Sequence, residues 1–219
     1  MDIIARMQTD FKRMLTRDIP GQNWDCDIIA DIGSGYPGTG YSISTRCVCY
    51  SKDGRQDQPM IRTSLTDPIQ RGNMIYLPEC DGGMFFLLEA VPQMGPNCYS
   101  TKGTRCNALI TIRETVPAST DQYGYTVTEA YDREALRNIP AVVRHTQTVS
   151  NGTGAAGMFF ADELTVTMQL NAFSSAVPVE AWFVLDDTRY IISDITTDGA
   201  THGTITYTAQ RQAGSRTGG

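Results

Sequence analysis

Residues 163–171 read ELTVTMQLN, and this stretch decides the fold class of the chain. Leu164, Val166, Met168 and Leu170 alternate without a break with polar residues. Successive side chains of a β-strand point to opposite faces, so this period of two predicts a strand with one buried face and one face in water.

Similar short runs continue on both sides of this stretch. They are rich in β-branched and aromatic residues and are separated by Gly, Pro, Asn and Asp, which is typical of strands and turns. The predicted strands are residues 24–31, 41–50, 74–77, 84–89, 105–113, 141–148, 164–173, 181–185, 189–194 and 203–211. The fold class is therefore predicted to be mainly β.

A similar unit occurs in each half of the chain. Residues 71–95 followed by 104–114, and residues 177–199 followed by 202–212, read as a strand, a tight acidic turn, an aromatic strand, a short loop and a last strand. Three such strands form a meander, a common seed of small barrels and sandwiches. We therefore expect two small β-barrel or sandwich-like modules.

An N-terminal amphipathic helix is expected before the first module. Its apolar residues recur at helical spacing, and Pro20 and Gly21 end the segment. The expected order is helix 1–18, first β module 19–116, linker 117–140 with one helical turn near 132–137, second β module 141–212 and extended tail 213–219.

Composition and charge limit the functional classes. The formal net charge is −6, so the whole molecule repels a phosphate backbone, which argues against sequence-specific DNA binding. No stretch approaches the roughly 20 apolar residues of a spanning helix. Asp2, Arg6 and Asp10 interrupt the apolar run that a signal peptide needs. We expect a chain that is neither inserted in a membrane nor exported by that route.

A literal G-x-G-x-x-G occurs at Gly33, Gly35 and Gly38. Dinucleotide binding requires a helix to begin at this motif, but Pro37 lies inside it and the β-like residues 41–50 follow. The motif is therefore interpreted as a turn, and no cofactor is expected.

Six cysteines lie in the first half of the chain, two of them at Cys47 and Cys49 on one face of a predicted strand. A structural zinc site usually needs C-x-x-C knuckles, and His145 and His202 lie in the other half. We interpret the cysteines as small apolar side chains with free thiols, and expect no metal site.

Two carboxylate pairs, Asp186-Asp187 and Glu79/Asp81, could in principle serve a glycan hydrolase. Both pairs lie at predicted hairpin turns, where Asp is favoured for its local backbone hydrogen bonds. The sequence contains no G-x-S-x-G, H-E-x-x-H or P-loop. We therefore expect no catalytic residue and no enzyme.

Subunit contacts are expected at the predicted helix and after a glycine-rich loop. Phe11 and Leu15 lie on the apolar stripe of a helix that is marginal in water unless it packs on protein. Met158, Phe159 and Phe160 follow the loop and are costly if left in water. The alternative is that these three residues begin the following strand and enter its own core.

Arginines near the C-terminal tail are a further expected contact. Arg211 and Arg216 flank a Gly/Ser-rich stretch that has too little apolar surface to fold alone. The chain has fifteen arginines against three lysines, and arginine is the cation more often found in interfaces. We expect these two arginines to anchor the tail on neighbouring subunits.

The meander stretches carry a resemblance to a known family. Residues 71–112, with RGNMIYL, DGGMFFLLEAV and the strands around Asn97-Cys98 and Cys106-Asn107, and residues 181–210, with AWFVLDDTRYIISDI, resemble the head-closure or stopper proteins of tailed phages. The resemblance covers about half of the chain and is one of pattern.

The resemblance implies a virion protein of the head-to-tail neck. It implies a ring of copies of this chain, portal or adaptor and tail proteins as partners, and double-stranded DNA passing non-specifically through the channel. A stopper is a single small barrel, and this chain is larger, so another tail or baseplate subunit is an alternative. Rivals from other classes are a phage-borne glycan hydrolase and a monomeric carbohydrate-binding module.

Overall fold

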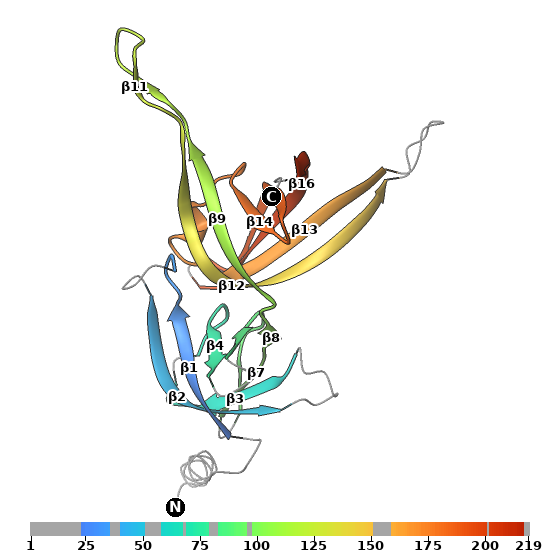
Figure 1. Ribbon diagram of the computed structural model, residues 1–219. Helices are drawn as coiled ribbons and strands as arrows, with labels where there is room; N and C mark the ends of the chain where they lie inside the picture. The colour runs from blue at the N-terminus through green and yellow to red at the C-terminus, as the bar shows by residue number, and fades with distance from the viewer. Residues whose placement is uncertain are drawn as a thin grey trace, which may run out of the picture.

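The computed structural model describes residues 23–35, 40–50, 58–67, 69–78, 83–95, 98–150, 159–200 and 202–216. The protein is mainly β, as predicted, and consists of a curled eight-stranded sheet and a closed six-stranded barrel (Figure 1). The predicted helix over residues 1–18, with Phe11 and Leu15, lies outside the described residues. No helix in the described part of the chain is long and apolar enough to cross a membrane.

The first half of the chain forms the sheet, with strand order β6-β7-β3-β2-β1-β4-β5-β8. Its strands are β1 Asn23–Asp31, β2 Tyr41–Tyr50, β3 Met60–Ser64, β4 Met74–Leu77, β5 Met84–Leu87, β6 Gln93–Met94, β7 Cys98–Lys102 and β8 Thr104–Arg105. Its core is apolar and includes Ile28, Ile61 and Ile75, together with Cys26 and Cys47.

The barrel has strand order β12-β13-β16-β15-β14-β9. Its strands are β9 Ala108–Val116, β12 Tyr131–Ser150, β13 Phe159–Gln169, β14 Trp182–Leu185, β15 Thr188–Asp198 and β16 Thr204–Arg216, with a 3₁₀ turn at Ser174–Ala176. Leu164, Val166 and Met168 are fully buried in its core, as their alternation predicted. Two short strands, β10 Ser119–Thr120 and β11 Thr126–Thr128, form a separate pair beyond the barrel.

Both predicted meanders are present, but the last strand of the first meander is shorter than predicted. Strands β14, β15 and β16 are consecutive neighbours in the barrel, and β4, β5 and β8 are consecutive neighbours in the sheet. The strand predicted over residues 105–113 is divided at Cys106 and Asn107, where the chain crosses from sheet to barrel. The Asn107 amide receives the Val143 N–H at 2.7 Å and donates to the Val143 carbonyl at 2.9 Å, so this side chain continues the strand pairing.

Residues 117–140, expected as a linker, contain β10, β11 and the first half of β12. The helical turn expected near 132–137 is wrong, because these residues pair with β9 as an antiparallel strand. The pairing places Arg133 opposite Glu114 and Glu134 opposite Arg113. Cross-strand ion pairs thus stabilise a hairpin where local sequence suggested a helix.

Gln169 at the end of β13 joins the sheet to the barrel. Its side chain is on the face expected to lie in water, yet it is only 2% exposed. Its Nε2 donates to the carbonyls of Ile29 and Ala30 at 3.1 Å each and of Gly72 at 2.9 Å. Its Oε1 accepts the Ile32 N–H at 2.6 Å. The face of β13 that was predicted to be exposed to solvent is therefore buried at this end of the strand, because the sheet covers it.

Close backbone contacts surround this glutamine. A side chain at Gly72, where φ is +84°, would overlap the carbonyl oxygen of Gly203. A side chain at Gly35 would likewise overlap the carbonyl oxygen of Arg137, whose N–H donates to Ser34 at 2.9 Å. The glycine-rich turn is thus a contact between sheet and barrel.

Removing the Gln169 amide is expected to unfold the junction. Gln169→Ala removes four hydrogen bonds to backbone groups of the junction and should lower the free energy of unfolding by about 3 kcal/mol. Urea denaturation measures this loss. The control Gln210→Ala, on an exposed side chain of β16, should change stability by less than about 0.5 kcal/mol. Equal stability of the two variants would contradict the role of Gln169.

Cys106 provides a pH-dependent probe of the same junction. Burial beside Met74, Leu87 and Val142 raises the pKa of its thiol from 9.0 to about 12. The unfolded thiol then ionises before the folded one, so this contribution to stability is complete below pH 9 and is lost as the pH rises towards 12.

We expect wild-type protein to lose stability relative to Cys106→Ala across this pH range, by at most about 1.4 kcal/mol per pH unit. Denaturant unfolding at several pH values measures the difference. Burial also raises the pKa of Tyr207, but this residue is present in both proteins and its effect cancels. Parallel curves for the two proteins would contradict the buried thiol.

Candidate functional site

A long hairpin projects from the barrel. Strands β9 and β12 pair along the barrel wall and continue beyond it into β10 and β11 (Figure 1). We call residues 117–131 the arm, and every one of them is exposed. At its base, Arg133 pairs with Glu114 and Thr115 donates to Asp132 at 2.7 Å. Cross-strand contacts therefore hold the arm away from the barrel.

The tip of the arm is an ordered turn. Asp121 Oδ1 accepts the N–H groups of Tyr123 at 2.8 Å and Tyr125 at 2.9 Å. The Gly124 N–H donates to the Asp121 carbonyl at 3.0 Å, and Gly124 has a φ of +84°, which favours glycine. The tip is thus built by its own hydrogen bonds before any partner binds.

Large apolar side chains lie along the arm. Tyr123, Tyr125 and Val127 are 75%, 73% and 68% exposed, and Tyr131 is 49% exposed. Val127 lies in β11, and Tyr125 directly precedes this strand. An isolated two-stranded hairpin is marginal in water, and this one leaves its apolar side chains uncovered. The arm therefore has the character of a binding element.

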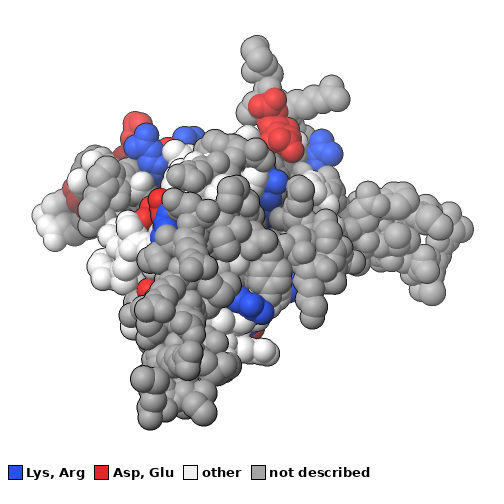
Figure 2. All heavy atoms as spheres, turned by 90° about the horizontal axis from the view of Figure 1, so that it is seen from below, with Lys and Arg blue, Asp and Glu red and all other residues white. Residues whose placement is uncertain are grey.

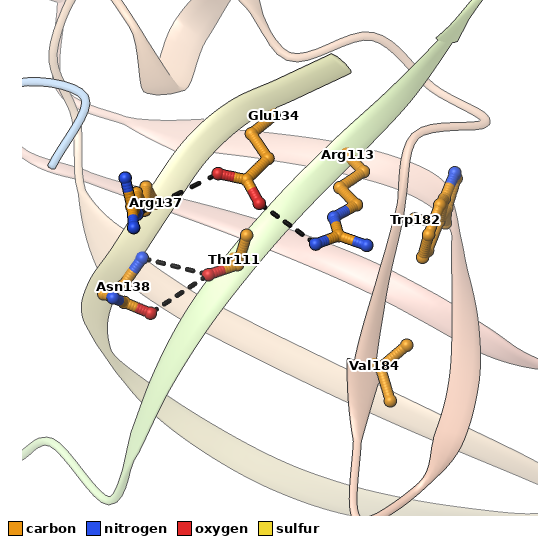
Figure 3. Close-up of a pocket in the computed structure, with 7 residues that line it drawn as sticks. All are labelled: Thr111, Arg113, Glu134, Arg137, Asn138, Trp182 and Val184. Atoms are coloured by element: carbon orange, nitrogen blue, oxygen red, sulfur yellow. Dashed lines mark hydrogen bonds and ion pairs between the residues drawn. The ribbon is translucent and has the colours of Figure 1, made fainter. Parts of the chain in front are cut away.

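The barrel is closed by a short strand pairing where β14 meets β9. One residue pair, Trp182 with Arg113, connects these strands among the described residues. A pocket of about 340 Å³ lies over this seam, and we call it the seam pocket. It is lined by Thr111, Arg113, Glu134, Arg137, Asn138, Trp182 and Val184 (Figure 3).

Bulges in β12 shape one wall of the seam pocket. The pairing register with β9 shifts between Glu134 and Ile139, and Asn138 has a φ of +50°. Bulges re-aim side chains at barrel rims and at functional sites. Here the Asn138 N–H donates to Thr111 Oγ1 at 3.1 Å, and the Arg113 guanidinium donates to the Glu134 carboxylate at 3.0 Å (Figure 3).

Trp182 forms the opposite wall. Trp182 lies outside the barrel core. It is nevertheless only 7% exposed, because two arginines cover its ring. The guanidinium carbon of Arg189 lies 3.9 Å from the ring centroid, and that of Arg113 lies 5.6 Å from it. The indole N–H is buried and has no hydrogen-bond partner within the described part of the chain. Buried tryptophan nitrogens are usually paired, so an unpaired one at the wall of a pocket is unusual.

Charges elsewhere are mixed in sign. Viewed from the end of the molecule that carries the sheet, described Lys and Arg side chains are interspersed with Asp and Glu (Figure 2). The described residues of this face therefore form no basic field of a single sign.

The predicted interface residues are placed only in part. Phe159 and Phe160 lie in β13, paired with Ser150 and Val149, in a second hairpin that extends beyond the barrel (Figure 1). Met158 lies outside the described residues. Arg211 is exposed on β16, and Arg216 lies near the end of the same strand, opposite Thr188.

The other predicted sites remain apart from the seam. Gly33 and Gly35, with φ of +65° and +83°, lie in a turn that follows β1, as predicted, and Gly38 lies outside the described residues. Asp186 and Asp187, with φ of +49° and +59°, form the tight turn between β14 and β15. Glu79 and Asp81 lie outside the described residues.

The described cysteines lie in the sheet and where the chain crosses from the sheet to the barrel. Cys26, Cys47, Cys49, Cys98 and Cys106 form no disulfide among the described residues. Within the same part of the chain, no three His, Cys, Asp or Glu side chains gather as metal ligands.

Sequence reasoning missed both the arm and the seam pocket. The arm falls in residues 117–140, which lack a clear period, although Tyr123, Tyr125 and Val127 alternate and could have indicated a strand. The seam pocket joins the β9–β12 hairpin to β14, which lies beyond β13 in the chain, and no local signal indicates it.

Arg189 is expected to shield Trp182. In a Trp24→Phe background Trp182 is the remaining tryptophan. Arg189→Ala should then increase acrylamide quenching of its fluorescence and lower the free energy of unfolding by about 1 kcal/mol. Lys102→Ala, an exposed cation on the sheet, is the control and should change neither quantity. Unchanged quenching in the Arg189 variant would show that the stack does not cover the ring.

Comparisons with known proteins identify no family. No family model matches the sequence, and no curated protein matches it. Among solved structures, K. pneumonia MrkH in its apo state is 11% identical over 95% of this chain and 86% of that chain, with a TM-score of 0.23. The MrkH–c-di-GMP complex is 8% identical over 96% of this chain and 86% of that chain, with a TM-score of 0.21. Likeness at this level carries no argument about fold or function.

Proposed function

We propose that this chain is a structural subunit of a ring in the neck of a tailed bacteriophage, where it would join the connector to the tail. The resemblance of residues 71–112 and 181–210 to head-closure proteins suggests the family. The single observation that carries the broader claim, a subunit of an assembly, is the arm: fifteen exposed residues held out from the barrel, with large apolar side chains that have no cover in the monomer.

Charge and shape support the same proposal. A net charge of −6 suits the wall of a channel through which DNA slides, because such a wall does not bind phosphate. The β12–β13 hairpin offers a second projection, and it carries Phe159 and Phe160. In this proposal, these two residues, Arg211 and Arg216 contact neighbouring subunits.

Shortening the arm tests the proposal. Ser119 and Thr128 are paired, so replacing residues 120–127 with Asn-Gly closes the hairpin with a two-residue turn and removes Tyr123 and Tyr125. The variant should keep the melting temperature of the wild type within a few degrees. When it is the only copy in cells that make the particle, we expect its incorporation into purified particles to fall at least about tenfold, on the hot-spot scale of interface side chains.

Quantitative mass spectrometry of the particles measures incorporation, and electron microscopy locates the chain. Position in a tail or baseplate layer would assign it to another structural subunit of the virion. Absence of the wild-type chain from particles would overturn the proposal. In that case the hydrolase alternative predicts turnover of a glycan, and the carbohydrate-binding alternative predicts that the exposed tyrosines bind a glycan array.

A further inference from the structure

The arm and the seam pocket carry opposite charges. The arm contains Asp121 and Glu129 and no Lys or Arg. The seam pocket is lined by two arginines, Arg113 and Arg137, and one carboxylate, Glu134, which pairs with both of them. A third arginine, Arg189, stacks on Trp182 at its edge. An acidic arm repels nucleic acid, and a cationic protein surface is its electrostatic match.

The two surfaces also match in their apolar and hydrogen-bonding groups. Tyr123 and Tyr125 offer aromatic rings with hydroxyl oxygens that accept hydrogen bonds. The seam pocket offers arginine planes that stack on aromatic rings, and the half-exposed side chain of Val184. Tyrosine in an arginine- and tryptophan-lined pocket is the composition of a strong protein interface.

The tip of the arm points away from the seam pocket of its own chain (Figure 1). Strands β9 and β12 form walls of the pocket and then continue away from the barrel into the arm (Figure 1). Cross-strand contacts at the base keep the arm in this direction. The arm tip therefore meets such a pocket only on another molecule.

We propose that the arm of one copy of this chain docks into the seam pocket of a second copy. Tyr123 and Tyr125 pack against Val184 and the arginine side chains that cover Trp182, and the acidic arm faces the pocket arginines. The proposal rests on the proposed function, because it names the surfaces that would join the subunits of the ring. Each copy offers an arm on one side and a pocket on another, and head-to-tail contacts of this kind close into rings or continue as filaments.

Two variants of the full-length chain test the docking. Tyr123→Ser/Tyr125→Ser removes the anchors of the arm, and Val184→Asp places an acid in the pocket. Each should weaken self-association at least about tenfold in sedimentation velocity. Tyr41→Ser, at an exposed tyrosine of the sheet, and Val179→Asp, at a valine as exposed as Val184, are the matched controls and should associate like wild type.

Mixing the two variants gives the decisive measurement. The arm variant keeps an intact pocket and the pocket variant keeps an intact arm, so the mixture should form a dimer of one copy of each and nothing larger. In a Trp24→Phe background, the fluorescence of Trp182 in the arm variant should change when the pocket variant is added.

Other outcomes separate this inference from the proposed function. Absence of a mixed dimer, or undiminished self-association of either variant, overturns the docking. A wild-type chain that stays monomeric yet is present in particles overturns it too and indicates that the arm binds a different protein, while the proposed function stands. A chain that self-associates through arm and pocket but is absent from particles supports the docking and overturns the neck assignment.

Discussion

The amide of Gln169 is the interaction on which the arrangement of the molecule depends. It reaches from the barrel into the end of the sheet and satisfies backbone groups of three separate residues there, as well as the N–H of Ile32. Without it the Ile32 N–H and the buried Gly72 carbonyl would lose the hydrogen bonds that they make to this side chain, and leaving such groups unpaired is costly. The sheet and the barrel therefore have one mutual orientation, and the arm points in one direction from the whole body.

The junction differs in chemistry from the two cores that it connects. The cores are apolar and are made of alternating strand residues. The junction has a small apolar patch around Met74, Leu87 and Val142, and much of the rest is hydrogen bonds from Gln169, Asn107 and Asn171 to backbone atoms. Hydrogen bonds are directional, so this interface specifies an orientation where apolar burial alone would specify only contact.

The arm and the seam pocket are two consequences of unequal strand lengths. β14 has four residues, whereas β12 has twenty and β9 has nine. β14 therefore covers only part of β9, and the barrel closes through the pair of Trp182 and Arg113. The open part of the seam becomes a pocket, and the excess length of the β9–β12 hairpin becomes the arm. One hairpin thus supplies a projection and part of a recess in the same subunit.

The sequence by itself determined the class of the fold and much of its strand pattern. The alternation of residues 163–171 predicted a core strand, and strands β2 and β4 begin and end where their β-branched and aromatic runs do. These features are local, because a period of two and a turn residue act over a few positions. Strands β3 and β7 were missed, since their short runs are half polar and find their partners across the sheet.

Only the tertiary structure decided which polar residues are buried and which segments meet. Gln169 has the sequence pattern of a solvent-exposed strand position, and it is buried only because the sheet packs against it. Residues 131–140 resemble a helical linker in isolation and become a strand because β9 lies beside them. The seam pocket exists because the distant strand β14 meets the β9–β12 hairpin. Burial and convergence depend on contacts between residues far apart in the chain, and no local pattern encodes them.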